Sequence, residues 1–267
     1  VEVESRCIAH AVRALGLGRG DTCAIMLQNR IEYVAVMLGL VRAGVVAALL
    51  NTSIGGAALE HAVRETKARA LIVGSECLAS FAGVAENLPR WVVPDAEVAL
   101  EAGQFDLLER AGAIGARAIP AEWRAAIVGE DVALYIFTSG TTGLPKAAIL
   151  SHMRWLMGAE VKVAMMGLDD RDVFYCFLPM FHGAVAMSLF AAAVSAGGGF
   201  VIRRRFSASR FWDDVRAHGV TTCQYVGEIC RYLMNAPARP DDRDHSLRAI
   251  TGTGMSHELW GAFQQRF

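Results

Sequence analysis

Short apolar runs and longer amphipathic stretches follow one another along the first part of this chain. They predict, in order, helix Val3–Leu15, strand Thr22–Leu27, helix Ile31–Arg42, strand Val45–Leu50, helix Ala57–Lys67 and strand Ala70–Val73. A second series predicts strand Val173–Phe177, helix Ala184–Val194, strand Phe200–Ile202, helix Ala208–His218, strand Thr221–Tyr225 and helix Glu228–Asn235. Strands that alternate with helices form parallel sheets covered on both faces. The pattern therefore predicts an α/β fold, and its two series suggest two related subdomains.

Two apolar stretches raise the question of a membrane span. Tyr33–Leu50 is interrupted by Arg42 and Gly44, which predicts a helix followed by a buried strand. Gly183–Ile202 carries no charged residue, but the glycines at 197–199 divide it into a short helix and a strand. We favour a buried helix and strand over a span in both places.

A loop rich in hydroxyl groups and glycine lies between the two series. An apolar run, Val132–Phe137, precedes it, and a second one, Ala147–Leu150, follows it. The pattern predicts a loop that joins two strands, with Ser151 as the N-cap of a helix over Met153–Met166. Residues 88–130 are less regular, and Pro237–His245 is the best candidate for an exposed loop.

The loop is built from groups that bind anions. Hydroxyl side chains supply hydrogen bonds, glycines let successive backbone N–H groups turn toward one ligand, and a lysine follows Pro145. The candidate residues are Thr138, Ser139, Gly140, Thr141, Thr142, Gly143 and Lys146. This chemistry indicates a nucleoside triphosphate. A Walker A loop is less favoured because Ala147 stands where that motif has Ser or Thr and the loop does not run into a helix. A ligand-free hairpin would need none of the hydroxyls.

The string from Thr138 to Lys146 resembles the phosphate loop of the adenylate-forming enzymes, which include acyl-CoA synthetases, luciferases and peptide-synthetase adenylation domains. Ala147 and Ala148 after the lysine, Val201–Asp214 and Gln224–Leu233 are similar to the branch of very-long-chain acyl-CoA synthetases and fatty-acid transport proteins. The resemblance runs over essentially all 267 residues. It implies parallel sheets flanked by helices in two related subdomains of the large N-terminal domain of that family.

The resemblance also implies an activity and a set of roles. A long- or very-long-chain fatty acid reacts with ATP to give an acyl-adenylate, which reacts with coenzyme A; Mg²⁺ assists. Residues 139–143 and Lys146 would hold the phosphates, and Thr138 would help to bind the metal. His182 would lie beside the acyl carboxylate and act with Lys146 in catalysis, because an imidazole can donate a hydrogen bond to developing negative charge. A histidine that only satisfies backbone groups is the plainer alternative.

Two further segments receive roles from the resemblance. Gly252, Thr253 and Gly254 would line the adenylate, although an ordinary turn between strand and helix explains this segment as well. Tyr225 and Gly227 would border the acyl tunnel, and core packing explains Tyr225 nearly as well.

Composition narrows the class of protein. The chain is 54% hydrophobic and 20% charged, which allows a sizeable core, and its net charge of −1 gives no reason to expect nucleic acid as a partner. Cysteines are scattered without metal-ligand spacing, so we expect reduced thiols and a cytoplasmic protein. They are Cys7, Cys23, Cys77, Cys176, Cys223 and Cys230. Peripheral attachment to a membrane and a homodimer stay open.

Complete members of the family carry further motifs for adenine, ribose and Mg²⁺, and a small C-terminal domain with a catalytic lysine. None is present up to Phe267, so we expect residues 1–267 to be a partial AMP-binding N-terminal domain, inactive by itself, without the small C-terminal domain. Two alternatives stay open: a CoA ligase for another acid, such as a bile acid or a carnitine-like acid, and a non-catalytic binding or scaffold module.

Overall fold

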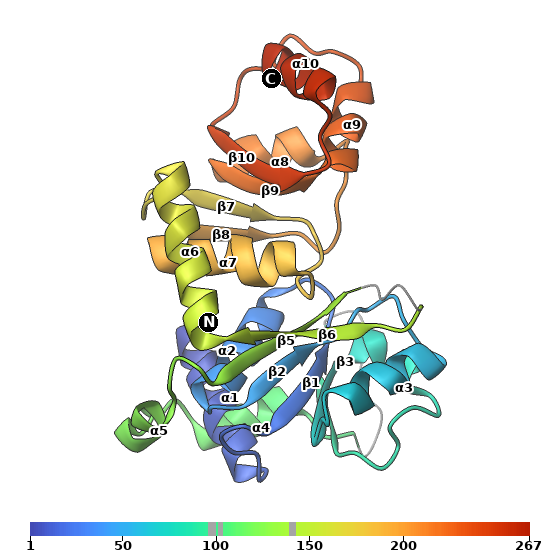
Figure 1. Ribbon diagram of the computed structural model, residues 1–267, viewed down its shortest axis with the longest axis vertical. Coiled ribbons are helices and arrows are strands. Elements are labelled where there is room, and N and C mark those ends of the chain that lie inside the picture. Colours follow the sequence, from blue (N-terminus) through green and yellow to red (C-terminus); the bar gives the residue numbers. More distant parts are fainter. Residues whose placement is uncertain (96–99, 101–103, 139–142) are drawn as a thin grey trace. The chain divides into compact units, whose positions relative to one another are not determined.

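The computed structural model describes residues 1–95, 100, 104–138 and 143–267. The chain forms two compact units, Val1–Trp155 and Leu156–Phe267, which are described separately (Figure 1). Helix α6 (His152–Met166) runs from the first unit into the second.

The first unit contains a mixed sheet with strand order β4-β3-β1-β2-β5-β6. All neighbouring strands are parallel except β5 and β6, which are antiparallel. Its strands are β1 (Thr22–Met26), β2 (Val46–Leu49), β3 (Ala70–Gly74), β4 (Arg90–Val93), β5 (Val132–Thr138) and β6 (Lys146–Ser151). Its helices before α6 are α1 (Glu2–Ala14), α2 (Ile31–Arg42), α3 (Gly56–Glu65), the 3₁₀ segment η1 (Ser75–Phe81), α4 (Leu107–Ile114) and α5 (Ala121–Ala126).

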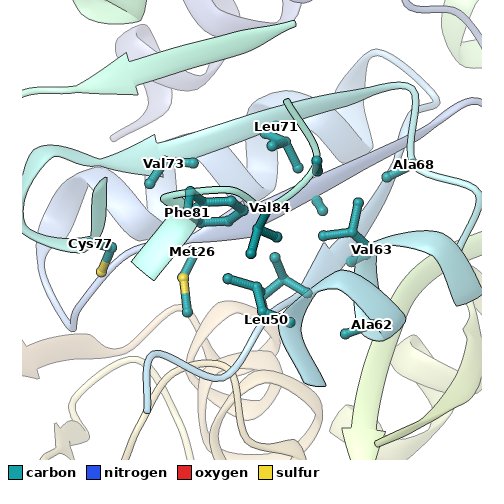
Figure 2. Close-up of a cluster of buried hydrophobic side chains, with 14 residues drawn as sticks. Met26, Leu50, Ala62, Val63, Ala68, Leu71, Val73, Cys77, Phe81 and Val84 are labelled. Atoms are coloured by element: carbon teal, nitrogen blue, oxygen red, sulfur yellow. The ribbon is translucent and has the colours of Figure 1, made fainter. Parts of the chain in front are cut away.

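Helices cover this sheet on both faces, as the alternating pattern predicts. Helix α1 packs against α2 and α4, while α3 packs against η1. Figure 2 shows the core on the α3 side, where Met26 and Val73 of the strands meet Val63 of α3 and Phe81 of η1. All four side chains are almost completely buried. Side chains of alternate strand residues thus pack into two hydrophobic cores, one on each face of the sheet, as expected of a parallel sheet.

In the region at 88–130, expected to be less regular, the described residues include strand β4 and helices α4 and α5. Strand β4 pairs with β3 at the edge of the sheet, and Trp91 lies opposite Ile72. Helix α4 begins after Asp106, whose carboxylate accepts hydrogen bonds from the N–H groups of Leu108 and Glu109. The sequence did not predict these elements; α5, for example, has 6 residues and buries none of them.

The second unit contains a parallel sheet with strand order β10-β9-β7-β8. Its strands are β7 (Val173–Cys176), β8 (Gly199–Ile202), β9 (Thr222–Val226) and β10 (Ala249–Thr253). Its helices after α6 are the π-helix η2 (Ala184–Leu189), α7 (Phe190–Ala196), α8 (Phe211–His218), α9 (Gly227–Asn235) and α10 (His257–Arg266). The predicted elements are all present within a few residues, but the π-helical turn in front of α7 was not foreseen.

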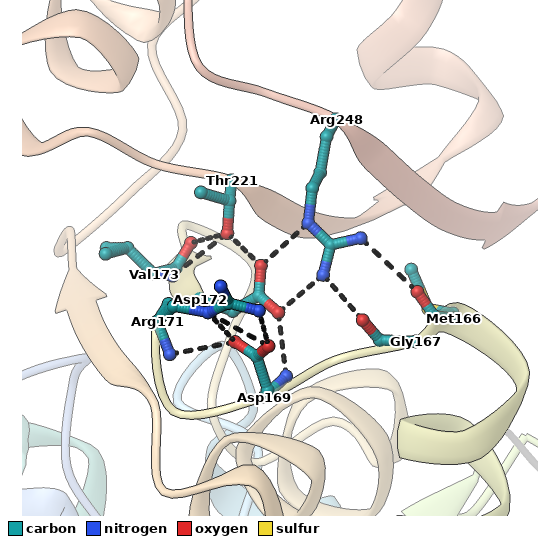
Figure 3. Close-up of polar contacts among 8 residues, drawn as sticks. All are labelled: Met166, Gly167, Asp169, Arg171, Asp172, Val173, Thr221 and Arg248. Atoms are coloured by element: carbon teal, nitrogen blue, oxygen red, sulfur yellow. Dashed lines mark hydrogen bonds and ion pairs between the residues drawn. The ribbon is translucent and has the colours of Figure 1, made fainter.

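A polar cluster joins three strands of this sheet at their amino-terminal ends (Figure 3). Asp172 lies directly before β7, Thr221 directly before β9 and Arg248 directly before β10. The buried carboxylate of Asp172 accepts hydrogen bonds from Thr221 Oγ1 at 2.6 Å and from Arg248 Nε at 2.9 Å. The opposite, carboxyl-terminal ends of the strands are therefore the ones left for a ligand, as is usual in open α/β sheets.

Both apolar stretches that raised the question of a span are divided into a helix and a strand. The first forms α2 and β2, and the second forms η2, α7 and β8. Within the described residues, no helix has the length and apolar character needed to cross a membrane.

Candidate functional site

The glycine- and hydroxyl-rich loop connects the antiparallel strands β5 and β6, as predicted. Thr138 and Lys146 are the last pair of this hairpin, and Thr138 Oγ1 donates a 3.5 Å hydrogen bond to the carbonyl oxygen of Lys146. Both residues are exposed. Gly143 has φ = +87°, a conformation that favours glycine. The other predicted phosphate-binding residues, Ser139, Gly140, Thr141 and Thr142, lie outside the described residues.

The chain after the loop passes through β6 before it becomes helical. Ser151 accepts a 3.4 Å hydrogen bond from the N–H of Arg154, so it caps α6 as predicted. A Walker A loop instead enters its helix directly and uses the helix N-terminus to hold phosphate. The strand between Lys146 and α6 therefore argues against a P-loop NTPase.

His182 lies in the second unit, between β7 and the π-helix η2. Its N–H donates to the carbonyl oxygen of Pro179 at 3.0 Å, and its own carbonyl oxygen accepts from Val185 and Ala186 at 2.9 Å. The backbone on both sides of His182 is thus fixed, while the residue is exposed and its ring packs near Phe181 at 5.8 Å. A fixed backbone with an exposed imidazole suits a side chain that contacts a ligand.

The predicted residues on β9 and β10 meet at the carboxyl-terminal ends of these neighbouring strands. Gly252 lies opposite Tyr225, and Thr253 lies opposite Val226. A Cβ atom on Gly252 would come within 2.2 Å of the Tyr225 carbonyl oxygen. Close packing of backbone on backbone therefore requires glycine here, whether or not a ligand approaches.

Tyr225 also has a packing role. Its ring lines a cavity of about 10 Å³ together with Phe177, Ile229 and Leu233, on the face of the sheet covered by α8, α9 and α10. Burial raises the pKa of the Tyr225 phenol. A space of this size holds about one water molecule and cannot take an acyl chain. Tyr225 thus takes part in core packing, and its role at the acyl tunnel stays a prediction.

The structure places the predicted residues in two groups. His182, Tyr225, Gly227 and residues 252–254 gather after or at the ends of β7, β9 and β10 in the second unit. Thr138, Gly143 and Lys146 belong to the hairpin of the first unit.

A second polar cluster in this unit, centred on Lys162 and distinct from the Asp172 cluster, was not predicted from the sequence. Lys162 of α6 donates from Nζ to Ser188 Oγ of η2 at 3.0 Å and to Gln224 Oε1 of β9 at 2.5 Å. Thr251 of β10 donates to the same Gln224 oxygen at 3.0 Å. The signal in the sequence was one lysine between Val161 and Val163 in an apolar helix, and it was too slight to interpret alone.

The described residues contain no group of three or more His, Cys, Asp or Glu side chains that could hold a metal ion. All six cysteines are buried, and burial raises the pKa of Cys176 and Cys223 to about 12 and that of Cys230 to about 11. These three groups are therefore neutral thiols at physiological pH and poor metal ligands.

Comparison with known proteins gives three kinds of match. The family model described as AMP-binding enzyme matches residues 1–267. The medium/long-chain-fatty-acid–CoA ligase FadD6 of Mycobacterium tuberculosis is 37% identical over 97% of the chain and 42% of its own length. Human long-chain fatty acid transport protein 6 is 35% identical over all of the chain and 43% of its own length.

Among solved structures, the anthranilate CoA ligase AuaEII in complex with anthranoyl-AMP superposes with a TM-score of 0.87 at 21% identity. The match covers 98% of this chain and 51% of that one. This likeness shows a shared fold. The chain spans less than half the length of the two curated relatives.

Proposed function

Because the chain belongs to the AMP-binding enzyme family, we propose that the complete protein is an ATP-dependent CoA ligase for long- or very-long-chain fatty acids. The observation that carries the proposal is the identity of 35–37% to a fatty-acid CoA ligase and to a fatty acid transport protein, over nearly the whole chain. We also propose that residues 1–267 form part of the N-terminal domain of that protein. The small C-terminal domain would lie outside them.

The chemistry starts from a carboxylate, which is a poor electrophile. A carboxylate oxygen attacks the α-phosphorus of ATP, and pyrophosphate leaves with the electrons of the broken P–O bond. The thiol of coenzyme A then attacks the acyl carbon, and AMP leaves. Several anions must come together in the first step, so the site needs cations and hydrogen-bond donors placed in advance.

The hairpin of the first unit fits the phosphate end of this reaction. Lys146 is exposed at the base of the loop and belongs to no ion pair among the described residues, so its ammonium is available for a phosphate group. Residues 139–143 would donate to the phosphates as the resemblance implies.

Mg²⁺ would supply positive charge to the phosphates. On the described part of the hairpin, the Thr138 hydroxyl oxygen can serve as a metal ligand. It is exposed and makes only a long hydrogen bond. One hydroxyl is a suitable but weak ligand, which agrees with an ion that arrives with the nucleotide. Thr138 would thus contribute one oxygen to an ion held mainly by phosphates.

His182 fits the acyl end. Its backbone is fixed on both sides at the carboxyl-terminal end of β7, and its imidazole is exposed there. An N–H of the ring can donate to the oxygen of the acyl carboxylate as charge develops during attack. Gly252, Thr253 and Gly254 lie at the same edge of the sheet, at the end of β10, which β9 separates from β7, and would form another wall of the site.

Acid-dependent exchange of pyrophosphate into ATP by the complete protein tests the proposal. Exchange that requires palmitate or a longer acid is the expected result. Exchange that responds only to sterol or betaine acids would assign the protein to another acid, and no exchange with any acid would reject adenylation and favour a binding or scaffold module.

A further inference from the structure

The cluster around Lys162 differs from an ordinary lysine on a helix surface. Lys162 is half-buried, and its ammonium is held by neutral oxygens of Ser188 and Gln224. Among the described residues it has no carboxylate partner. Glu160, the nearest acid on the same helix in sequence, bonds instead to Ser195 of α7. A half-buried cation without a counter-ion is costly, and burial lowers the pKa of Lys162 to about 8.

The cluster has more hydrogen-bond donors than acceptors. Oε1 of Gln224 accepts from Lys162, from Ser188 at 3.4 Å and from Thr251. Because this oxygen faces an ammonium, the amide orientation is fixed and its NH₂ group points elsewhere. No contact in the described residues uses that NH₂ group, and the ammonium has three N–H bonds for two partners. The cluster therefore lacks an acceptor, preferably a negative one.

Its position in the sheet is close to the candidate site. Gln224 and Thr251 are register partners in the middle of β9 and β10, and Val226 and Thr253 end the same strands. Residues two apart on a strand face the same side and are separated by about 7 Å. The cluster thus lies one such step inside the carboxyl-terminal edge of the sheet.

The two faces of the sheet are not equivalent. The neighbouring strand residues Cys223 and Tyr225 face the water-sized cavity under α9 and α10. Gln224 and Thr251 face the other side, where Ser188 of the π-helix follows His182 by six residues along the chain. A π-helical turn is uncommon and often accompanies a functional site. Here it brings the Ser188 hydroxyl to Lys162.

We propose that the Lys162–Ser188–Gln224 cluster binds a second carboxylate on the acid substrate, so that the protein favours dicarboxylic acids over simple fatty acids of equal length. This inference rests on the proposed adenylation chemistry and adds short diacids to its substrates, because a cluster about 7 Å inside the edge can reach the second carboxylate of a short acid only. The second carboxylate supplies the missing counter-ion to Lys162 and accepts from the Gln224 NH₂ group. The carboxylate that reacts stays at the edge of the sheet near His182.

Matched pairs of acids test the proposal with the complete protein. Pyrophosphate exchange is measured for mono- and dicarboxylic acids of equal length, from hexanoic and hexanedioic to hexadecanoic and hexadecanedioic acid. The wild type should prefer the diacid, by kcat/KM, at the length that reaches Lys162. Lys162→Met should lower this preference by roughly ten- to a hundred-fold and leave the rate with the monoacid unchanged or higher.

Two more variants separate charge from packing. Gln224→Glu supplies an internal counter-ion of the same size and should also remove the preference for the diacid. Glu160→Gln changes another polar contact of the same helix and should keep it.

Binding gives a readout that does not need turnover. The midpoint of thermal unfolding should rise more with the diacid than with the monoacid in the wild type, and equally with both in Lys162→Met. Equal preferences and equal shifts in wild type and Lys162→Met would overturn the inference. Exchange with monoacids alone would overturn it and leave the proposed function standing, whereas a diacid-specific thermal shift without any exchange would support the site and reject adenylation.

Discussion

The Cβ position of Gly227 lies 1.8 Å from the carbonyl oxygen of Gly254. The first turn of α9 and the end of β10 are therefore in backbone contact, without room for any side chain. This contact holds together the two strand ends where the adenylate is proposed to bind.

Gly227→Ala should therefore destabilise the protein strongly, by at least about 3 kcal/mol, because the atom it meets is backbone and cannot move aside cheaply. The free energy of unfolding in urea measures this. Gly261→Ala is the control, since Gly261 lies within α10 and no atom lies within 4 Å of its Cβ position. That change should stabilise the helix by about 0.5–1 kcal/mol. Similar values for the two variants would contradict the contact.

Lys146→Ala should slow adenylate formation by roughly ten- to a thousand-fold in the complete protein, because a charged contact to the transferred phosphates is lost. Pyrophosphate exchange at saturating fatty acid measures this. Arg124→Ala removes a charge from an exposed position on α5 and should leave the exchange rate unchanged. Unaltered kinetics in Lys146→Ala would refute the role of the loop.

The Asp172 cluster should make stability depend on pH. Burial alone would raise the pKa of Asp172, but hydrogen bonds from Arg248 and Thr221 outweigh it, so the pKa is lowered. Because the pKa of Asp172 is lower in the folded protein than in the unfolded chain, its ionised form stabilises the fold at pH values above the unfolded pKa of about 3.9. This stabilisation is lost as the pH falls through the folded pKa.

Asp172→Asn should therefore cost about 2 kcal/mol at neutral pH, the scale of hydrogen bonds to a charged group. The difference from wild type should shrink below about pH 4. Urea unfolding at a series of pH values measures both, and a difference that does not change with pH would show that charge is not involved. Asp170→Asn, at an exposed neighbouring residue, is the control.

The cysteines should all be reduced. All six cysteines are buried. No disulfide involves Cys7, Cys23, Cys176, Cys223 or Cys230. Titration of the denatured, unreduced chain should find six thiols per molecule, whereas the native protein should react slowly because buried thiols ionise poorly. Fewer than six after denaturation would reveal a disulfide.

Residues 1–267 by themselves should make no acyl-CoA. The relatives matched are more than twice as long, and the family's further nucleotide contacts are expected in the remainder. Without them the α-phosphate is not oriented, and orientation supplies much of the rate. Incubation with ATP, Mg²⁺, palmitate and coenzyme A should yield no thioester above background, while the complete protein does. Turnover by these residues alone would show that the active site is placed wrongly.

The order of the main strands and helices could be predicted from the apolar positions alone. Burial on both faces of a parallel strand leaves a continuous apolar run, and burial of one face of a helix leaves an apolar period. The β5–β6 hairpin, with Lys146 at the start of its second strand, and the cap at Ser151 could also be predicted, since they depend on residues near in sequence. The contacts between distant segments could not be predicted in this way. The polar cluster joins Lys162, Ser188 and Gln224 from three elements, and the glycines at 227 and 254 meet across two strand ends. Such contacts depend on strand register and on which face each helix covers, and the local pattern of a single segment carries neither.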